Sequence, residues 1–207
     1  MQKRDVAVVG EIYIDHIFTG FATWPQPGEE VFTRAYMREI GGGAANTACA
    51  LGRLGRTVSL FGVIGAADAE WFESRLREFG ISIDDMERTR GNTGVTVSVS
   101  MQDDRSFFSY MGENEKLAKM LRSDVVLASL CEARHVHFAM PLDPRVAEYL
   151  LPKLRTAGCT TSLDVGFSPL WLRDPACLDT CRAVDYLLPN EREASLLSHD
   201  ENALNYL

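Results

Sequence analysis

A run of three glycines followed by an amide side chain is the part of the sequence best suited to chemistry. Gly41, Gly42 and Gly43 lack Cβ atoms, so this backbone can adopt positive φ and let a ligand approach closely. The helix-forming residues that follow would direct unpaired N–H groups and a positive helix dipole toward the same spot. Asn46 offers both a donor and an acceptor, which suits a polyhydroxylated ligand better than a simple anion. A glycine-rich turn with Asn46 merely exposed is the structural alternative.

Two well-known glycine motifs do not match this run. A P-loop needs Lys and then Ser or Thr after its last glycine, whereas Asn46 and Thr47 follow here at a different spacing. A dinucleotide fingerprint has Gly or Ala at the position of Asn46 and an acid about 20 residues later. This chain has Ser-Leu-Phe-Gly-Val at 59–63 instead. The glycine run is therefore not a standard nucleotide loop.

Polar residues also follow three other apolar runs. They are Gly10-Glu11 with Asp15, Asp164-Val165-Gly166, and Pro189-Asn190-Glu191-Arg192-Glu193. Ligands of open α/β sheets bind at the carboxyl ends of the strands, so four such places in one chain indicate a site. Each group alone is also explained as a helix cap or a solvated turn.

The apolar pattern predicts the elements that position these residues. Apolar runs predict strands over 5–18, 31–40, 57–64, 135–139, 160–165 and 185–188. Helical segments are predicted over 44–54, 68–79, 144–157, 175–183 and onward from Glu191. Repeated β–α units predict a Rossmann-like, mostly parallel sheet with helices on both faces.

A different pattern marks a β-hairpin with one polar face. Residues 93–101 alternate strictly between polar and apolar, and 106–110 resume after a polar turn at 102–105. Together with 12–18 and 33–40, the hairpin predicts a small sheet outside the main body. We expect this lid to come from about 12–40 and 93–110.

Composition limits the partners. The 207 residues, 46% hydrophobic and 24% charged, suit one domain with a sizeable core. A net charge of −8 argues against nucleic acid and anionic membranes, and no apolar run approaches membrane-spanning length. Residues 1–5 lead directly into a strand without a signal-peptide pattern, so we expect a cytoplasmic protein.

The cysteines and histidines do not predict a metal site. The five cysteines are odd in number and widely spaced, which suits reduced, mostly buried thiols. Cys177 and Cys181 share a helical face, but no second Cys or His pair completes a zinc site. His135 and His137 share one face of a predicted strand, where we expect a structural role rather than metal binding.

The motifs, in this order, resemble those of the ribokinase-like (PfkB) family of sugar kinases along essentially the whole chain. Residues 10–15 resemble the opening motif whose last acid holds sugar hydroxyls. Residues 41–46 resemble the Gly-Gly-x-x-x-Asn substrate motif, whose signature continues through Gly52, Gly55, Gly62 and Gly65. Residues 110–114 are similar to the Gly-Ala-Asn turn after the lid hairpin.

Two later motifs extend the resemblance. Asp164 and Trp171 resemble the Asp-x-Asn…Leu-Trp stretch, although Gly166 stands where Asn is usual. Asn190 and Glu193 match the Asn-x-x-Glu motif that organises Mg²⁺ and phosphate.

The resemblance implies a Rossmann-like domain with a β lid and ATP-dependent phosphorylation of a sugar hydroxyl. Asp15 and Asn46 would then hold sugar hydroxyls, and Gly42 and Gly43 would let the sugar approach the backbone. Glu193 would organise Mg²⁺ through water, while Asn190 would orient phosphate oxygens. Mg²⁺ and ATP are therefore the expected cofactor and co-substrate, and such chemistry needs positioning and charge neutralisation above all.

One family motif has no counterpart in the sequence. The family's late Gly-Ala-Gly-Asp segment, whose aspartate is the catalytic base, is not matched after Glu193. We therefore expect residues 1–207 to form one ribokinase-like domain that is incomplete at its C-terminal side. That domain would carry the sugar-binding and lid portion without transferring phosphate by itself. The catalytic base stays unassigned.

Two other functions fit the same residues. A non-catalytic sugar-binding or regulatory protein can share the fold. A dimerisation module is the other alternative, because a lid sheet with one apolar face often pairs with its copy. The sugar itself is open. Candidate pocket neighbours are Glu11, Phe32, Met101, Phe108 and Tyr110, whose bulk suits a nucleoside, and the equal alternative is that they only close the apolar face of the lid. A simple furanose or ketose is favoured.

Overall fold

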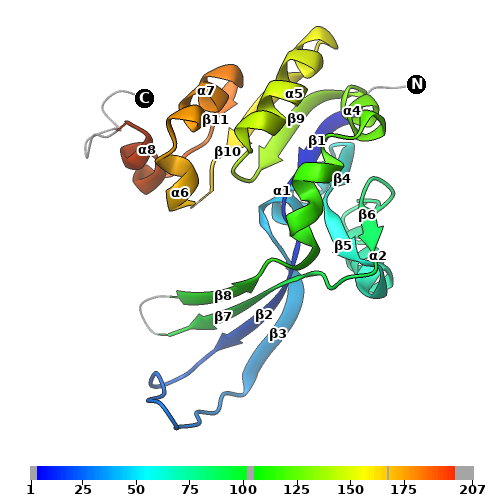
Figure 1. Ribbon diagram of the computed structural model, residues 1–207. Helices are drawn as coiled ribbons and strands as arrows, with labels where there is room; N and C mark the ends of the chain where they lie inside the picture. The colour runs from blue at the N-terminus through cyan, green and yellow to red at the C-terminus, as the bar shows by residue number, and fades with distance from the viewer. Residues whose placement is uncertain (1–3, 102–104, 167, 199–207) are drawn as a thin grey trace.

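The computed structural model describes residues 4–101, 105–166 and 168–198, and it consists of an α/β body and a projecting lid sheet (Figure 1). The body is built on five parallel strands in the order β11–β10–β9–β1–β4. In that order the strands are Tyr186–Leu187, Thr160–Asp164, Ala133–Ala139, Arg4–Val9 and Val58–Phe61. Parallel neighbours need long crossover connections, and helices supply them here.

Helices cover both faces of the body sheet, as the sequence predicted. Along β1, Val8 packs in a core with helices α1 and α2, whereas Ala7 and Val9 pack in a second core with α3, α4 and α5. Successive strand residues point to opposite faces, so one apolar strand supplies both cores. The helices are α1 Gly43–Arg53, α2 Ala69–Arg77, α3 Leu117–Met120, α4 Asp124–Leu130, α5 Pro144–Thr156, α6 Pro169–Leu172, α7 Pro175–Ala183 and α8 Glu191–Ser198.

Two predicted strands are each divided between two sheets. The run predicted over 5–18 is divided where its part 12–18 was assigned to the lid: β1 ends at Val9, and the chain enters the lid as β2 (Tyr13–Thr19). The strand predicted over 57–64 breaks at Gly62 into β4 and β5 (Val63–Gly65). β5 pairs with β6 (Glu87–Thr89), which the sequence did not predict. An apolar run conceals such breaks when the residues on both sides of the break are buried.

The lid is a four-stranded mixed sheet in the order β3–β2–β7–β8. Its strands besides β2 are β3 (Ala35–Gly41), β7 (Gly94–Ser100) and β8 (Arg105–Tyr110). β2 runs antiparallel to β3 and parallel to β7, and β7 and β8 form the predicted hairpin. Of its predicted turn, residues 102–104 lie outside the described residues. The extent of the domain, 1–207, stays a prediction.

The side chain of Asn114 joins the lid to the body. Its Oδ1 accepts a hydrogen bond from Ile12 N at 3.0 Å, and its Nδ2 donates to Ile12 O at 2.9 Å. Ile12 lies between β1 and β2, and Asn114 lies in the 3₁₀ segment η2 (Gly112–Lys116) that follows β8. Both residues are buried, so this pair of bonds fixes the place where the chain crosses between body and lid.

Two ion pairs also connect lid strand β3 with helix α2. Arg75 Nη2 lies 2.6 Å from Glu39 Oε2, and Arg38 Nη2 lies 3.5 Å from Asp68 Oδ1. The helix predicted to begin at Asp68 begins at Ala69 instead. Asp68 belongs to a preceding 3₁₀ turn, η1 (Ala66–Asp68), and accepts a hydrogen bond from Thr93 Oγ1 at 2.6 Å. Its carboxylate therefore anchors the start of the hairpin.

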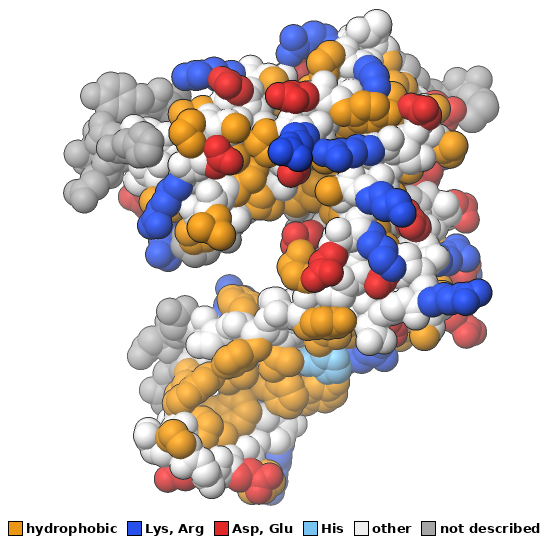
Figure 2. Space-filling model, viewed as in Figure 1, with side chains coloured by type: hydrophobic (Ala, Val, Ile, Leu, Met, Phe, Trp, Pro, Cys, Tyr) orange, Lys and Arg blue, Asp and Glu red, His pale blue; other side chains and the backbone are white. Residues whose placement is uncertain are grey.

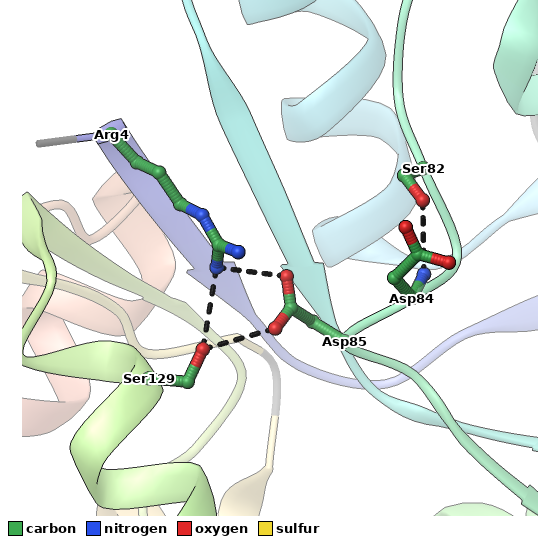
Figure 3. Close-up of polar contacts among 5 residues, drawn as sticks. All are labelled: Arg4, Ser82, Asp84, Asp85 and Ser129. Atoms are coloured by element: carbon green, nitrogen blue, oxygen red, sulfur yellow. Dashed lines mark hydrogen bonds and ion pairs between the residues drawn. The ribbon is translucent and has the colours of Figure 1, made fainter. Parts of the chain in front are cut away.

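A polar cluster holds three segments together beside the first residue of β1 (Figure 3). Arg4 Nη1 lies 2.9 Å from Asp85 Oδ2, and Ser129 Oγ donates to Asp85 Oδ1 at 3.0 Å. Arg4 also reaches Ser129 Oγ at 3.3 Å. The cluster links β1, the segment before β6, and α4, far from the carboxyl ends of the strands. We assign it a structural role.

Candidate functional site

The glycine run lies where the lid meets the first helix. Gly41 ends β3, and Gly42 is the N-cap residue of α1, with φ of +90° and no side-chain capping bond. A Cβ on Gly42 would overlap the carbonyl oxygen of Glu11. The positive φ and this close approach both require glycine. The first turn of α1 is thereby left without a side-chain cap, as a helix end that receives a ligand would be.

Asp15 lies directly beside the glycine run. The residue is in β2, and a Cβ on Gly41 would overlap its carboxylate. Burial raises the pKa of the half-buried Asp15 carboxyl above its ordinary 3.8, an effect that nearby His16 opposes. No hydrogen bond from the described residues reaches this carboxylate. Asp15 is therefore a desolvated acceptor without a protein donor among those residues.

Asn46 faces a hollow between α1, α2 and β3. The hollow has a volume of about 310 Å³, and its lining includes Asn46, Glu39, Arg75 and Phe79. Glu39 is the cross-strand partner of Asp15 in the lid sheet. Asp15 does not line this hollow, so the two residues share only Glu39 as a neighbour. Contact of both side chains with one ligand stays a prediction.

The register of the lid assigns its residues to two faces. Asp15 pairs with Thr96, and Thr96 with Ser109, so these three side chains lie on one face. Val97 pairs with Phe108, and Val95 with Tyr110, on the opposite face. Of the two alternatives for Phe108 and Tyr110, the register therefore favours the one in which they close the apolar face of the lid, since neither lies on the face of Asp15. Phe107, which the sequence analysis did not select, lies on the Asp15 face.

The sequence shows on which face of the hairpin Thr96 lies, but it does not show which other residues share that face. Alternation over 93–101 places Thr96 on the polar face of the hairpin, together with Ser98. Only the pairing of β7 with β2 shows that this face is the Asp15 face. That pairing joins strands about 80 residues apart and has no local sequence signature.

Asn190 and Glu193 form a reciprocal helix cap. Asn190 Oδ1 accepts from Glu193 N at 2.9 Å, while the two oxygens of Glu193 accept from Asn190 N at 2.9 Å and Nδ2 at 2.8 Å. This is the capping-box arrangement, and it explains the spacing of the motif without a ligand. Each Glu193 oxygen keeps a further lone pair, and the Asn190 amide keeps one proton.

The remaining strand-end groups have local partners. Asp164 Oδ1 accepts from Gly166 N at 3.1 Å, and Trp171 Nε1 donates to Leu142 O at 2.9 Å. His135 Nε2 and His137 Nδ1 both lie within hydrogen-bond distance of Ser162 Oγ, at 2.7 and 2.8 Å. The two histidines thus share a face, as predicted. The part of the chain that the structure describes holds no cluster of three acids, cysteines or histidines that could bind a metal ion.

Comparison with known proteins agrees with the fold. The sequence model of the pfkB family of carbohydrate kinases matches residues 3–206. A ribokinase of Bacillus subtilis (strain 168) is 26% identical over 198 residues. That match covers 94% of this chain and 64% of the relative, so the chain spans less than two thirds of the relative's length.

Solved structures show the same architecture. The ribokinase of Arabidopsis thaliana, complexed with ribose and ATP, has a TM-score of 0.79 and 22% identity, covering 99% of this chain and 68% of that one. A nucleoside kinase from Methanocaldococcus jannaschii has a TM-score of 0.71 and 22% identity, covering 97% and 65%. At these identities the likeness shows the fold: a Rossmann-like, mostly parallel sheet flanked by helices, with a small lid sheet.

Proposed function

The chain belongs to the pfkB family of carbohydrate kinases, and from that premise we propose that it carries the sugar-binding and lid portion of an ATP-dependent sugar kinase. The Asp15 carboxylate is the main support for this proposal. It is half-buried, lies against the glycine run, and accepts no hydrogen bond from the described residues. A sugar hydroxyl would supply the missing donor. Asn46 would hold a second hydroxyl, with Gly42 and Gly43 leaving room for the ring.

Calorimetric titration tests sugar binding. We expect the protein to bind at least one of ribose, fructose and adenosine without nucleotide. The proposal would be contradicted if none of these three ligands gave a heat of binding. A coupled ADP-release assay with Mg·ATP tests phosphoryl transfer, which we expect to be absent from residues 1–207 alone because no Gly-Ala-Gly-Asp counterpart follows Glu193. Robust turnover would place the base within this sequence.

Asn190 and Glu193 are proposed to serve Mg²⁺ and the phosphates in addition to capping α8. The free lone pairs of Glu193 suit water-mediated contact with Mg²⁺, whose waters are retained in most protein sites. When bound, the ion would neutralise phosphate charge. Asn190→Ser tests this proposal, because serine keeps an N-cap oxygen but lacks the amide, which both bonds to Glu193 Oε1 and would face the phosphates. The proposal expects a lower melting temperature together with weaker binding of Mg·ADP, both measured by calorimetry, whereas a purely capping role predicts the lower melting temperature alone.

Two further proposals concern the setting of the protein. We propose a homodimer formed through the apolar face of the lid, where Tyr36, Phe108 and Tyr110 are at least half exposed. We also propose a cytoplasmic location, which is consistent with five cysteines that form no disulfide among the described residues. Within the described ranges, no helix combines the length and apolar character needed to cross a bilayer.

A non-catalytic sugar-binding protein is the alternative. It predicts the same calorimetric binding but no ADP release from any form of the protein that contains these residues.

A further inference from the structure

A row of polar side chains crosses the lid on the face of Asp15. The register places Glu39, Asp15, Thr96 and Ser109 side by side on β3, β2, β7 and β8. Neighbouring strands lie about 4.8 Å apart, so adjacent members of the row are within reach of one small ligand. Glu39 is already paired with Arg75 at 2.6 Å. Asp15, Thr96 and Ser109 are the members that remain for a ligand.

The hydrogen-bonding capacity of this trio is complementary to a sugar. Thr96 Oγ1 and Ser109 Oγ lie 3.2 Å apart and share one hydrogen bond. That bond uses one of their two protons, which leaves one proton to donate and several lone pairs to accept. Asp15, when ionised, only accepts. A hydroxyl that donates to Asp15 can therefore accept from the Thr96–Ser109 pair, and a neighbouring hydroxyl can donate to it.

We propose that Thr96 and Ser109 are specificity-determining residues that bind substrate hydroxyls together with Asp15. The inference rests on the proposed sugar-binding function and adds the recognition mode. The lid recognises the sugar by hydrogen bonds, and the substrate has at least two neighbouring hydroxyls that contact the lid. A sugar that lacks one of them loses affinity, because hydroxyls of the lid are then left without partners.

A purely structural role makes a different prediction. Cross-strand Thr–Ser pairs stabilise sheets without any ligand. In that case the loss of either hydroxyl lowers the melting temperature and leaves sugar affinity unchanged. The two roles are therefore separated by measuring both quantities on the same variants.

Thr96→Val and Ser109→Ala remove the hydroxyls with little change in shape, and valine suits a strand. Ser106→Ala is the matched control, because Ser106 lies on β8 but pairs with Val99 on the opposite face. Calorimetry with ribose, fructose and adenosine measures the dissociation constants. We expect each site variant to raise the constant of the bound sugar about fivefold, as the loss of one hydrogen bond does. Ser106→Ala should leave the dissociation constant unchanged, and Thr96→Ser, which keeps the hydroxyl that Thr96→Val removes, should bind the sugar as tightly as the wild type.

The deoxy analogues of the bound sugar complete the test. Against the analogue that lacks the recognised hydroxyl, Thr96→Val should bind as well as the wild type. If the wild type binds sugar and both variants bind equally well, the inference is overturned while the proposed function stands. If the wild type binds none of the three ligands, both the proposed function and this inference are refuted.

Discussion

The half-buried carboxylate of Asp15 lowers the stability of the folded protein and provides an acceptor for a ligand. Burial raises the pKa of its carboxyl, which means that the folded state disfavours the charged form. A group with a raised folded pKa contributes stability below its unfolded value and loses that contribution as pH rises through the folded value. At neutral pH the carboxylate therefore opposes folding, and binding residues commonly carry such a cost.

Asp15→Asn should raise the melting temperature at pH 7 and weaken sugar binding. The amide removes the desolvated charge, and it also places an N–H donor where a sugar hydroxyl would donate. Asp179→Asn is the control, since that side chain is 82% exposed. Differential scanning calorimetry and sugar titration measure the two effects. A variant that binds sugar as tightly as the wild type would remove Asp15 from the site.

Sugar affinity should also fall in acid at a pH above that expected of an exposed aspartate. The ordinary value is 3.8, and the raised pKa of Asp15 moves its protonation to higher pH. Protonation removes an acceptor site from the carboxylate. A titration series between pH 7 and the onset of unfolding, repeated with Asp15→Asn, should show this decline in the wild type alone.

At the scale of elements, strand β9 carries a pH-sensitive pair of histidines. Burial lowers the pKa of His135 and of His137 below the ordinary 6.5, because the folded sheet disfavours their charged forms. The unfolded chain then binds more protons than the folded chain as pH falls through 6.5. The neutral histidines thus contribute stability above that pH, and the contribution is lost in more acidic solution.

These histidines should therefore lower the free energy of unfolding from pH 7 toward pH 5, whereas protonation of Asp15 in acid acts in the opposite direction. Asp5 and Asp185, whose pKa values are lowered by bonds to Thr57 and Thr161, act only below about 3.8. In urea titrations, His137→Gln should flatten the decline between pH 7 and 5. Parallel curves for wild type and His137→Gln would contradict this assignment.

The Asn114 side chain holds one corner of the junction between body and lid. Asn114 satisfies the buried N–H and C=O of Ile12. Asn114→Ala leaves both groups without their partner and should lower the free energy of unfolding by about 2–5 kcal/mol. Asn92→Ala, at an exposed residue of the same region, is the control. Urea unfolding measures the change, and a loss similar to that of the control would refute the role of Asn114.

The sequence predicted elements well where a local pattern determines them. Helix 144–157 begins at Pro144 after the capping residue Asp143, and the structure has α5 at Pro144–Thr156. Helix α4 was missed because its apolar residues span only 124–130, too short for a clear period. The faces of Phe107 and Phe108, in contrast, depend on long-range pairing. Candidate residues could be named from motifs, but not the face on which each one lies.

For the whole molecule, the lid presents a broad apolar surface. Hydrophobic side chains gather over the lid sheet, which stands apart from the α/β body across an open notch (Figure 2). Tyr36 and Phe108 belong to this face, and Trp24 stacks on Phe108 with ring centroids 6.3 Å apart. Exposed apolar patches of this kind mark contact surfaces. A second copy of the lid is the partner that we propose.

Light scattering should therefore give the mass of a dimer at micromolar protein concentration. Phe108→Asp should produce monomers, because it places a charge in the apolar face. Phe107→Asp is the matched control on the opposite face of the same strand, and it should remain dimeric. A wild-type protein that is monomeric throughout the concentration range would contradict the proposal.

The two hydrogen bonds between Asn114 and Ile12 also determine how the lid can move relative to the body. The chain passes between body and lid at four places, 10–13, 41–43, 91–94 and 110–114. The two hydrogen bonds of Asn114 join the first of these passages to the last. The ion pairs Arg75–Glu39 and Arg38–Asp68 attach the β3 side of the lid to the body as well. Rotation of the lid about the Asn114–Ile12 corner would therefore strain these partly exposed ion pairs first, whereas sliding of the lid along the body would require the buried bonds of Asn114 to break.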